Sequence, residues 1–214
     1  MDMHWVYAAG AMVVSYLCGS VPTSVWWGKA FFGMDVREHG SRNAGATNTF
    51  RVLGTRAGVP VLLIDMLKGF LPVRVLAWWS GLEDTSADYA WLRVGMSLAA
   101  VVGHLYPVFA GFRGGKGVAT SFGTILAMHR GAALICLGVF LLVYLGTRYV
   151  SLGSLCAAVA FPVAVLFIDA DDHLVLQGFA LVICVMVFWT HRANIGRLLR
   201  GEESRMHFSS GSPP

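Results

Sequence analysis

The sequence predicts an all-α, polytopic membrane protein with seven transmembrane helices, and three observations support this fold class. Hydrophobic residues make up 56% of the 214 residues, whereas only 13% are charged, about half the share in a soluble domain. The mean hydropathy is +0.64. Several apolar stretches approach the ~20 residues that a helix needs to cross a bilayer. This composition excludes a soluble globular domain, and low charge with high apolarity excludes a disordered chain.

Seven apolar segments are predicted to be the helices. They are Trp5–Trp27, Ala57–Trp79, Tyr89–Ala110, Gly115–Met128, Ala132–Leu145, Leu152–Ile168 and Leu174–Thr190. The first segment is too long for a signal peptide and has no Lys or Arg before it, so we predict a retained span. The fourth is short, rising only about 21 Å as a helix. The chain is therefore expected to turn within the membrane, which is tolerated where backbone lines a polar cavity.

Lys and Arg are concentrated in one set of loops, which predicts the orientation. Loops 28–56, 111–117 and 146–151 and the segment after residue 190 hold twelve of the sixteen basic residues, whereas the opposite loops are acidic. Basic loops stay in the cytoplasm, so an odd number of spans places the N-terminus in the periplasm and the C-terminus in the cytoplasm. We predict a single membrane domain over residues 1–214, with a disordered cytoplasmic tail over about 204–214, because its end is rich in Ser, Gly and Pro.

Several classes of partner are not expected. The net charge of +4 is not carried by a run of basic residues, so nucleic-acid binding is a poor interpretation. Cys18, Cys136, Cys156 and Cys184 lie in apolar stretches without metal-site or redox spacing. With no other metal-binding motif in the sequence, we expect no metal and no cofactor.

The stretch Gly40–Asn48, with Arg51 after it, is the first candidate phosphate site. Small residues let the backbone approach a ligand closely, Ser, Thr and Asn offer hydrogen bonds, and Arg offers a charged fork. An ordinary polar loop is the alternative. The candidate substrate-binding residues here are Ser41, Asn43, Thr47, Asn48 and Arg51.

The second candidate phosphate site is the loop Gly111–Gly117, which enters a predicted helix. Backbone N–H groups of a Gly-rich turn at a helix N-terminus can bind an anion. The loop is not a Walker A motif, because Ala110 and Gly117 stand where that motif needs Gly and Ser or Thr. A flexible helix entry is the alternative. The candidates are Gly114, Gly115, Lys116 and Gly117.

Two charges lie inside the second predicted span, where Asp65 and Lys68 share one helix face. Intramembrane charges are functional candidates, but a neutralised pair that braces the bundle explains them equally well. His104, near the end of the third predicted span, is either functional or a packing or capping residue. Catalytic and structural roles therefore both stay open for these three residues.

A fourth group of candidates follows the last span. His191 and Asn194 share a helix face, and His can transfer a proton while Asn bonds or orients a substrate. A helix cap is the alternative for His191. Ser151 is a further candidate substrate-binding residue, although a serine that opens a helix is usually its N-cap.

Two phosphate-suited loops in a membrane setting predict anionic substrates with an apolar tail. No G-x-S-x-G elbow is present, so a covalent serine enzyme is not expected. Transfer between two phosphorylated substrates that the protein aligns and neutralises fits better. The alternative is a transporter of phosphorylated solutes, which should carry polar determinants on both membrane faces. A non-catalytic scaffold does not explain the two loops.

Taken in order, the motifs resemble those of the bacterial PlsY family, the acyl-phosphate:glycerol-3-phosphate acyltransferases. The matching motifs are Gly19-Ser20-Val21-Pro22 with Gly28-Lys29, Gly40–Asn48, Asp65-x-x-Lys68-Gly69, Gly103-His104 through Pro107-Val108-Phe109, Gly111–Thr120 and His191-x-x-Asn194. They span roughly residues 15–203. The family pattern has Gly where Arg42 stands, so Arg42 receives no family role.

The resemblance implies seven spans in the bacterial inner membrane and a site that faces the cytoplasm. The reaction would move a fatty acyl group from acyl phosphate to position 1 of sn-glycerol 3-phosphate, giving lysophosphatidic acid and phosphate. No His is followed five positions later by Asp, which agrees, because the families that use acyl-CoA or acyl carrier protein carry that motif. Membrane lipids would surround the chain, either as a monomer or weakly associated with other enzymes of phospholipid synthesis.

The resemblance also implies residue roles, with Lys116, His191 and Asn194 as catalytic residues. Ser41, Arg51 and Ser151 would join them around the phosphates. Lys116 and its loop would neutralise the departing phosphate, and Arg51 would hold glycerol 3-phosphate. Acyl phosphate is already activated, so we expect direct attack by the glycerol hydroxyl without an acyl-enzyme. Either His191 or a substrate phosphate would accept the proton.

Overall fold

The computed structural model describes residues 3–168 and 173–206. Within these residues the regular structure is helical, with ten α-helices and two short 3-10 helices. The described residues fall into two compact units, up to residue 128 and from residue 129 onward, and each is described by itself.

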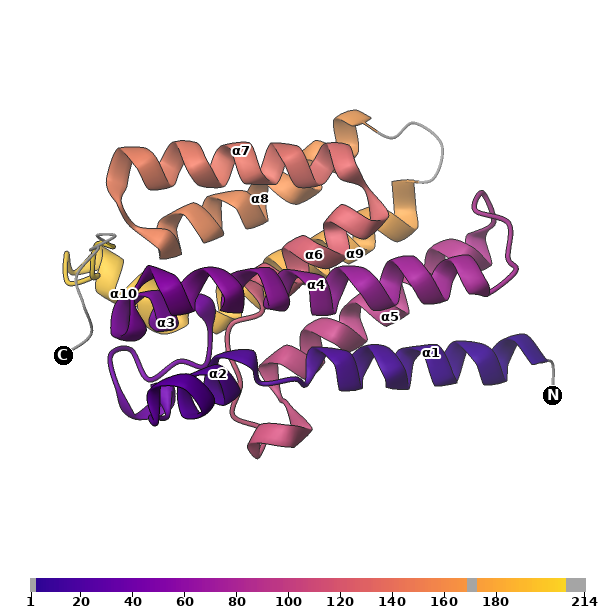
Figure 1. The fold of residues 1–214 in the computed structure, drawn as a ribbon. Helices are drawn as coiled ribbons and strands as arrows, with labels where there is room; N and C mark the ends of the chain where they lie inside the picture. The colour runs from indigo at the N-terminus through magenta and orange to yellow at the C-terminus, as the bar shows by residue number, and fades with distance from the viewer. Residues whose placement is uncertain (1–2, 169–172, 207–214) are drawn as a thin grey trace. The chain divides into compact units, whose positions relative to one another are not determined.

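The first unit is a helical bundle whose members come from distant parts of the sequence. Its elements are α1 (Met3–Gly19), α2 (Thr23–Phe32), η1 (Val36–Glu38), α3 (Ala46–Leu53), α4 (Thr55–Trp79), α5 (Ala87–Leu105), η2 (Val108–Ala110) and α6 (Val118–Met128) (Figure 1). Helices α1, α4 and α5 pack against one another, and α6 packs against α4 and α5. The two candidate phosphate loops belong to this unit.

The second unit is built around a pair of long apolar helices. Its elements are α7 (Arg130–Thr147), α8 (Val150–Ile168), α9 (His173–Thr190) and α10 (Arg192–Leu199) (Figure 1). Helix α8 packs against both α7 and α9, and the short α10 contacts α8 and α9. Arg148 ends α7 in the left-handed conformation, with its N–H donating to the Tyr144 carbonyl.

Glycines allow very close helix packing in the first unit. A Cβ at Gly69 would overlap the Thr120 carbonyl oxygen, and one at Gly123 would overlap that of Met66, so α4 and α6 approach backbone to backbone. Gly19 and Gly103 do the same for α1 and α5. Small residues at helix contacts are typical of membrane bundles, where close packing replaces the hydrophobic effect between helices.

All seven predicted apolar segments contain helix, but three predicted boundaries are wrong, two of them at a proline and one at the Gly-rich loop before α6. The first segment does not continue unbroken to Trp27, because α1 ends at Gly19 and α2 begins after Pro22. Proline lacks the N–H that would continue a helix and disfavours helical backbone in the residue before it. The third segment stops at Leu105 rather than Ala110 for the same reason, since Pro107 follows.

Within residues 3–168 and 173–206, four helical stretches are long and apolar enough to cross a membrane, and the pair α9 and α10, bent by 62°, makes a fifth when it is counted as one span. The four are Trp5–Phe32, Ala87–Ala110, Arg130–Thr147 and Val150–Phe167. Helix α4 is long enough but carries Asp65, Lys68 and Arg74. Helix α6, at 11 residues, is shorter still than its predicted segment, because it begins only after the Gly-rich loop.

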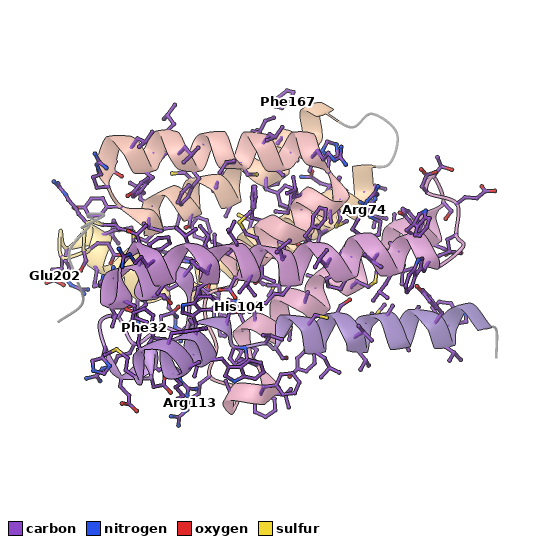
Figure 2. The ribbon with its side chains drawn as sticks, viewed as in Figure 1. Phe32, Arg74, His104, Arg113, Phe167 and Glu202 are labelled. Atoms are coloured by element: carbon purple, nitrogen blue, oxygen red, sulfur yellow. The ribbon has the colours of Figure 1, made fainter. Side chains whose placement is uncertain are left out.

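The outside of the helices is apolar, as a lipid-facing surface requires. Trp78 and Leu142 are 74% and 75% exposed, whereas polar side chains are buried inside the first unit. Figure 2 shows His104 in the interior of this unit and Arg113 on its outside. Large exposed apolar surfaces combined with buried polar groups indicate an integral membrane protein.

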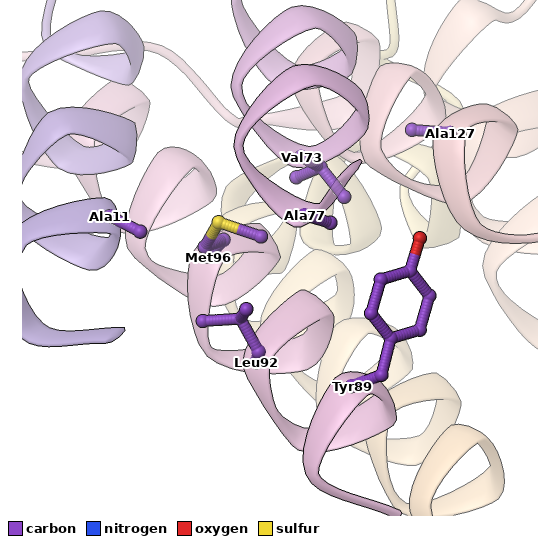
Figure 3. Close-up of a cluster of buried hydrophobic side chains, with 7 residues drawn as sticks. All are labelled: Ala11, Val73, Ala77, Tyr89, Leu92, Met96 and Ala127. Carbon is purple, nitrogen blue, oxygen red and sulfur yellow. The ribbon is translucent and has the colours of Figure 1, made fainter. Parts of the chain in front are cut away.

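Two hydrophobic clusters form the core of the first unit. The larger joins α1, α4, α5 and α6 and comprises Ala11, Val73, Ala77, Tyr89, Leu92, Met96 and Ala127 (Figure 3). The smaller joins α2, η1, α3 and α4 and comprises Val25, Val36, Ala44, Leu53 and Ala57. Because Ala44 belongs to the first candidate phosphate loop, this smaller cluster anchors that loop to the bundle.

Met206, near the start of the predicted disordered tail, is packed against the second unit. The Met206 N–H donates to the Arg148 carbonyl oxygen at 2.9 Å, and the Met206 side chain is buried. Residues 207–214, the remainder of the predicted tail, lie outside the described residues.

Candidate active site

The first candidate loop is held in shape by Asn48. Both amide hydrogens of Asn48 are engaged, donating to the carbonyl oxygens of Val36 at 2.8 Å and His39 at 3.1 Å. Its side-chain oxygen accepts from the Ser41 N–H at 2.8 Å, and the residue is 1% exposed. The prediction that Asn48 binds substrate is therefore corrected, because its donors are used to fix the backbone around Ser41.

The remaining predicted residues of this loop are accessible. Ser41 is exposed, and Asn43 and Thr47 are partly buried. Thr47 and Arg51 lie one turn apart in α3, on the same face, and Arg51 is exposed. A hydroxyl group and a guanidinium thus extend from a short helix whose opposite side is anchored in the core.

Arg42 differs from its neighbours in its backbone. It has a φ of 59°, in the left-handed region that glycine adopts without strain. Its N–H donates to the His39 carbonyl oxygen at 3.0 Å, and the residue is exposed. The turn therefore has the geometry of a glycine, although arginine occupies it.

Two cations of the same loop region are neutralised within the chain. Arg37 contacts both carboxylate oxygens of Asp35, and Lys29 lies 3.3 Å from the same carboxylate. The Arg37 guanidinium, more than any other group, holds the pKa of Asp35 well below its usual range. Arg37 also donates to the Ala110 carbonyl oxygen at 3.0 Å, which links this region to the second loop.

In the second loop, the N–H groups of Gly114 and Gly115 are not directed at a ligand. They donate to the carbonyl oxygens of Leu105 and His104, each at 3.2 Å, at the end of α5. The predicted anion-binding nest is therefore wrong for these two glycines. Their carbonyl partners are the ones that a helix end leaves unsatisfied, so the loop docks onto α5.

Gly115 brings the two candidate loops into contact. A Cβ at this position would overlap the His104 ring and would lie 2.8 Å from the Ala44 carbonyl oxygen. Gly117 follows with a φ of +81°, and a Cβ there would lie 2.6 Å from Leu105 Cδ1. Lys116, between them, is partly buried and lies two residues before the first residue of α6. The second half of this loop is thus packed so tightly that Gly114, Gly115 and Gly117 have no room for side chains.

Asp65, Lys68 and His104 are all buried in the first unit. The Lys68 ammonium lies 2.8 Å from Asp65 Oδ1, so the predicted intrahelical pair forms. His104 Nδ1 lies 3.8 Å from the same carboxylate oxygen. These three side chains lie behind the second loop, against which the His104 ring packs.

In the second unit, Ser151 and Asn194 contact a residue that the sequence analysis missed. Glu203 Oε1 accepts from Ser151 Oγ at 2.7 Å and from Asn194 Nδ2 at 2.6 Å, and Oε2 accepts from Arg197 Nε at 2.7 Å. Burial alone would raise the pKa of Glu203, but these three hydrogen bonds outweigh it and lower the pKa below its usual value. Two acidic residues, Glu202 and Glu203, directly after a basic helix were the available signal.

This geometry corrects the predicted roles of Ser151. Ser151 is not the N-cap of α8, because it lies inside the helix. Its single hydroxyl hydrogen is donated to Glu203, so it is not available to donate to a substrate phosphate. Asn194 also donates to Glu203, through one of the two N–H groups of its amide.

His191 lies at the bend between α9 and α10. Its Nδ1 is 2.8 Å from the Val187 carbonyl oxygen, which can only accept, so Nδ1 carries the hydrogen. In the neutral ring Nε2 then holds the lone pair, as a general base requires. His191 and Asn194 are both buried in this unit.

These features define the class of the protein: an all-helical integral membrane protein with clustered cationic, hydroxyl and amide groups in each of its two units. A family model described as glycerol-3-phosphate acyltransferase matches residues 9–201. The chain is 41% identical over 197 residues to the glycerol-3-phosphate acyltransferase of Fusobacterium nucleatum, covering 92% of this chain and 97% of that one. It is 43% identical over 209 residues to that of Salinibacter ruber, covering 91% and 90%.

Two solved structures have the same fold. Both are crystal structures of PlsY (YgiH), an integral membrane glycerol 3-phosphate acyltransferase, in a glycerol 3-phosphate form with a TM-score of 0.83 and in a lysophosphatidic acid form with a TM-score of 0.81. Each is 38% identical and covers 94% of this chain. The chain belongs to the glycerol-3-phosphate acyltransferase family and is an acyltransferase. The resemblance drawn from the motifs is confirmed, and the transporter alternative is set aside.

Proposed function

We propose that this chain transfers a fatty acyl group from acyl phosphate to position 1 of sn-glycerol 3-phosphate. The products are lysophosphatidic acid and inorganic phosphate, and no acyl-enzyme forms. The observation that supports this most directly is the contact of the two loops at Gly115, which lies against both Ala44 and His104. That contact holds Lys116 beside the loop that carries Ser41, and it suits two phosphate groups bound close together.

In the first unit, the proposed role of each residue is assigned from its exposure and charge. Arg51, with Thr47 on the same face of α3, holds the phosphate of glycerol 3-phosphate, because a guanidinium binds phosphate with two hydrogen bonds. Ser41 and Asn43 add hydrogen bonds from the loop that Asn48 fixes. Lys116 neutralises the phosphate that departs from the acyl group, which lowers the barrier where charge develops.

In the second unit, His191 and Asn194 act on the reacting hydroxyl group. The Nδ1–H bond to Val187 orients the ring and leaves Nε2 as the candidate base. A substrate phosphate is the alternative base. Asn194 orients a substrate, and Glu203 holds the Asn194 amide while Ser151 and Arg197 hold Glu203.

The proposed setting is the bacterial inner membrane. All seven helical segments span it or enter it, the N-terminus faces the periplasm, and the site faces the cytoplasm. Support comes from the basic residues of the two candidate loops and of α10, since basic segments stay on the cytoplasmic side. Acyl phosphate would reach the site from the lipid phase, and glycerol 3-phosphate from the water.

The test is an assay of the purified protein in lipid with glycerol 3-phosphate and either acyl phosphate or acyl-CoA as donor. We expect phosphate release and lysophosphatidic acid in equal amounts with acyl phosphate, and no product with acyl-CoA. Turnover of acyl-CoA alone would refute the proposed donor. A burst of phosphate before the acyl acceptor is added would indicate an acyl-enzyme and refute direct transfer.

Two variants test the residue roles within this assay. Lys116→Ala should lower kcat by about 10²–10³-fold, as expected for a lost charge-stabilising group, whereas Lys29→Ala, which changes a lysine paired with Asp35, should leave kcat within about twofold of wild type. His191→Gln should remove one ionisation from the pH–rate profile if His191 is the base. A retained rate and profile would assign the proton to a substrate phosphate.

A further inference from the structure

A buried polar cluster joins three helices beneath the second loop. Asp65 and Lys68 come from α4, His104 from α5 and Thr120 from the first turn of α6. Thr120 is completely buried, and Asp65, Lys68 and His104 are 1%, 8% and 5% exposed. Burying charged and polar groups inside a membrane bundle is costly, so such a cluster indicates that these side chains are needed to hold neighbouring segments in place.

The hydrogens of this cluster can be assigned from its geometry. Thr120 Oγ1 lies 3.0 Å from the Asp65 backbone oxygen, which can only accept, so the single hydroxyl hydrogen points there. Thr120 Oγ1 also lies 3.1 Å from His104 Nδ1. Since its own hydrogen is used, the Thr120 oxygen accepts, and His104 Nδ1–H is the donor. One hydroxyl therefore ties the start of α6 to both α4 and α5.

The turn Gly115–Gly117, which carries Lys116, is held on one side by His104 and on the other by Thr120. At its start, Gly115 donates to the His104 carbonyl oxygen, and the His104 ring fills the space beside Gly115. At its end, Thr120 stands only four residues after Lys116. Between these two ends Lys116 is the single polar side chain in the sequence, so the course of the loop depends on His104 and Thr120.

Asp65 and Lys68 brace this arrangement. The Lys68 ammonium donates to the Val21 carbonyl oxygen at 2.8 Å, at the break between α1 and α2, as well as contacting Asp65. The pair thus ties α4 to that break. Asp65 meanwhile presents its backbone oxygen to Thr120.

We propose that Thr120 and His104 are positioning residues that set the course of the Gly115–Lys116–Gly117 turn, with the Asp65–Lys68 pair as their structural support. The proposal deepens the proposed function and rests on it, because the turn is taken to bind substrate phosphate. It assigns all four side chains to positioning and none to proton transfer.

The experiment compares Thr120→Val, which exchanges the hydroxyl for a methyl group of similar size, with Thr120→Ser, which keeps the hydroxyl. We expect Thr120→Val to lower kcat/KM by about five- to tenfold, the size of one lost hydrogen bond, and Thr120→Ser to stay within about twofold of wild type. Equal activities for the two variants would overturn the proposal. So would an altered pH–rate profile in Thr120→Val.

Amide hydrogen exchange of residues 111–118 gives a readout that does not depend on activity. Exchange should be faster in Thr120→Val than in wild type or Thr120→Ser, while exchange in α7 and α8 stays unchanged as the matched control. Unchanged exchange in the loop would overturn the proposal even if activity falls. If wild type fails with acyl phosphate, the proposed function fails, and this exchange measurement still decides the positioning of the loop.

His104 supplies a second pair of variants should Thr120→Val fold poorly. Asn places an amide nitrogen near the position of Nδ1, and Gln places one near the position of Nε2. We expect His104→Asn to retain more kcat/KM than His104→Gln, with the pH–rate profile of wild type in both. The reverse order, or loss of an ionisation in either variant, would overturn the assignment.

Discussion

Arg42 has a backbone conformation that favours glycine. Its φ of 59° costs an arginine about 1 kcal/mol or more that glycine avoids, although glycine regains part of that difference as entropy in the unfolded chain. Arg42→Gly is therefore expected to stabilise the protein by up to about 1 kcal/mol, with kcat/KM unchanged within about twofold. Thermal unfolding and the acyl-transfer assay check both. A large loss of activity would give the guanidinium a role in substrate binding.

Glu203 accepts three hydrogen bonds, from Ser151, Asn194 and Arg197, and so holds these polar side chains of the second unit in place. Glu203→Gln keeps the shape but removes the charge that Arg197 contacts, and we expect a loss of about 2 kcal/mol at pH 7, as for hydrogen bonds to a charged group. The matched control is Glu202→Gln. Its ion pair with Arg200 is exposed, at 58% and 60%, so the expected change is under about 0.5 kcal/mol.

The lowered pKa of Glu203 also predicts a pH dependence. A carboxyl whose folded pKa is depressed stabilises the fold above its usual pKa of 4.5, and this contribution is lost as the pH falls through the lower folded value. The stability difference between wild type and Glu203→Gln should therefore be full at pH 7 and shrink below about pH 4.5. Unfolding curves at pH 7, 5 and 4 measure it, and a difference that grows on acidification would contradict the assignment.

Among the elements, the Gly-rich loop before α6 leaves little room for larger side chains at Gly114, Gly115 and Gly117. A Cβ at Gly115 would overlap the His104 ring and press on the Ala44 carbonyl oxygen, so Gly115→Ala must displace one of the two candidate loops. We expect kcat/KM to fall by about 10²-fold, as for a misplacement of about 1 Å, while the helix content stays the same.

Gly138→Ala is the control for this prediction. Gly138 lies in α7, where an added Cβ would have nothing within 4 Å, and alanine is the better helix former by about 0.5–1 kcal/mol. We expect this variant to be fully active and slightly more stable. Activity of Gly115→Ala at the level of Gly138→Ala would mean that the loop contact does not matter.

For the whole molecule, the distribution of charge predicts which ends face the cytoplasm. Thr85 lies in the acidic connection between α4 and α5, and Ser204 follows the basic helix α10. The test replaces each of them in turn by cysteine. In intact cells a membrane-impermeant maleimide should label Thr85→Cys, and it should label Ser204→Cys only after permeabilisation. The unmodified chain, with its four cysteines in apolar helices, is the background control. The opposite pattern would invert the proposed orientation.

Much of the fold could be predicted from the sequence, because apolar length and the positions of charges are local properties. All seven helical segments, the short fourth segment and the Asp65–Lys68 pair follow from spacing alone. Helix ends were less predictable where proline interrupts an apolar run, as at Pro22 and Pro107, since hydrophobicity continues past the break while the backbone hydrogen bonds do not.

The residue types of the candidate site could be predicted from the sequence, but the role of each residue could not. Phosphate-suited side chains can be recognised along the chain, yet whether a donor is available depends on what lies beside it in space. Asn48, Ser151 and the N–H groups of Gly114 and Gly115 all have the right chemistry, and all are used within the protein. Glu203 was missed because its three partners come from 6, 9 and 52 residues away.

By itself, the sequence determined the membrane class, the helical segments, the family and the presence of side chains suited to phosphate, because composition, apolar length and motif order are properties of the linear sequence. Only the tertiary structure decided which of those side chains, such as Asn48 and Ser151, form hydrogen bonds within the protein. The reason is that a hydrogen bond needs both a donor and an acceptor, and folding decides which partner lies within reach, whether it comes from 7 residues away, as for Asn48, or from 52, as for Ser151.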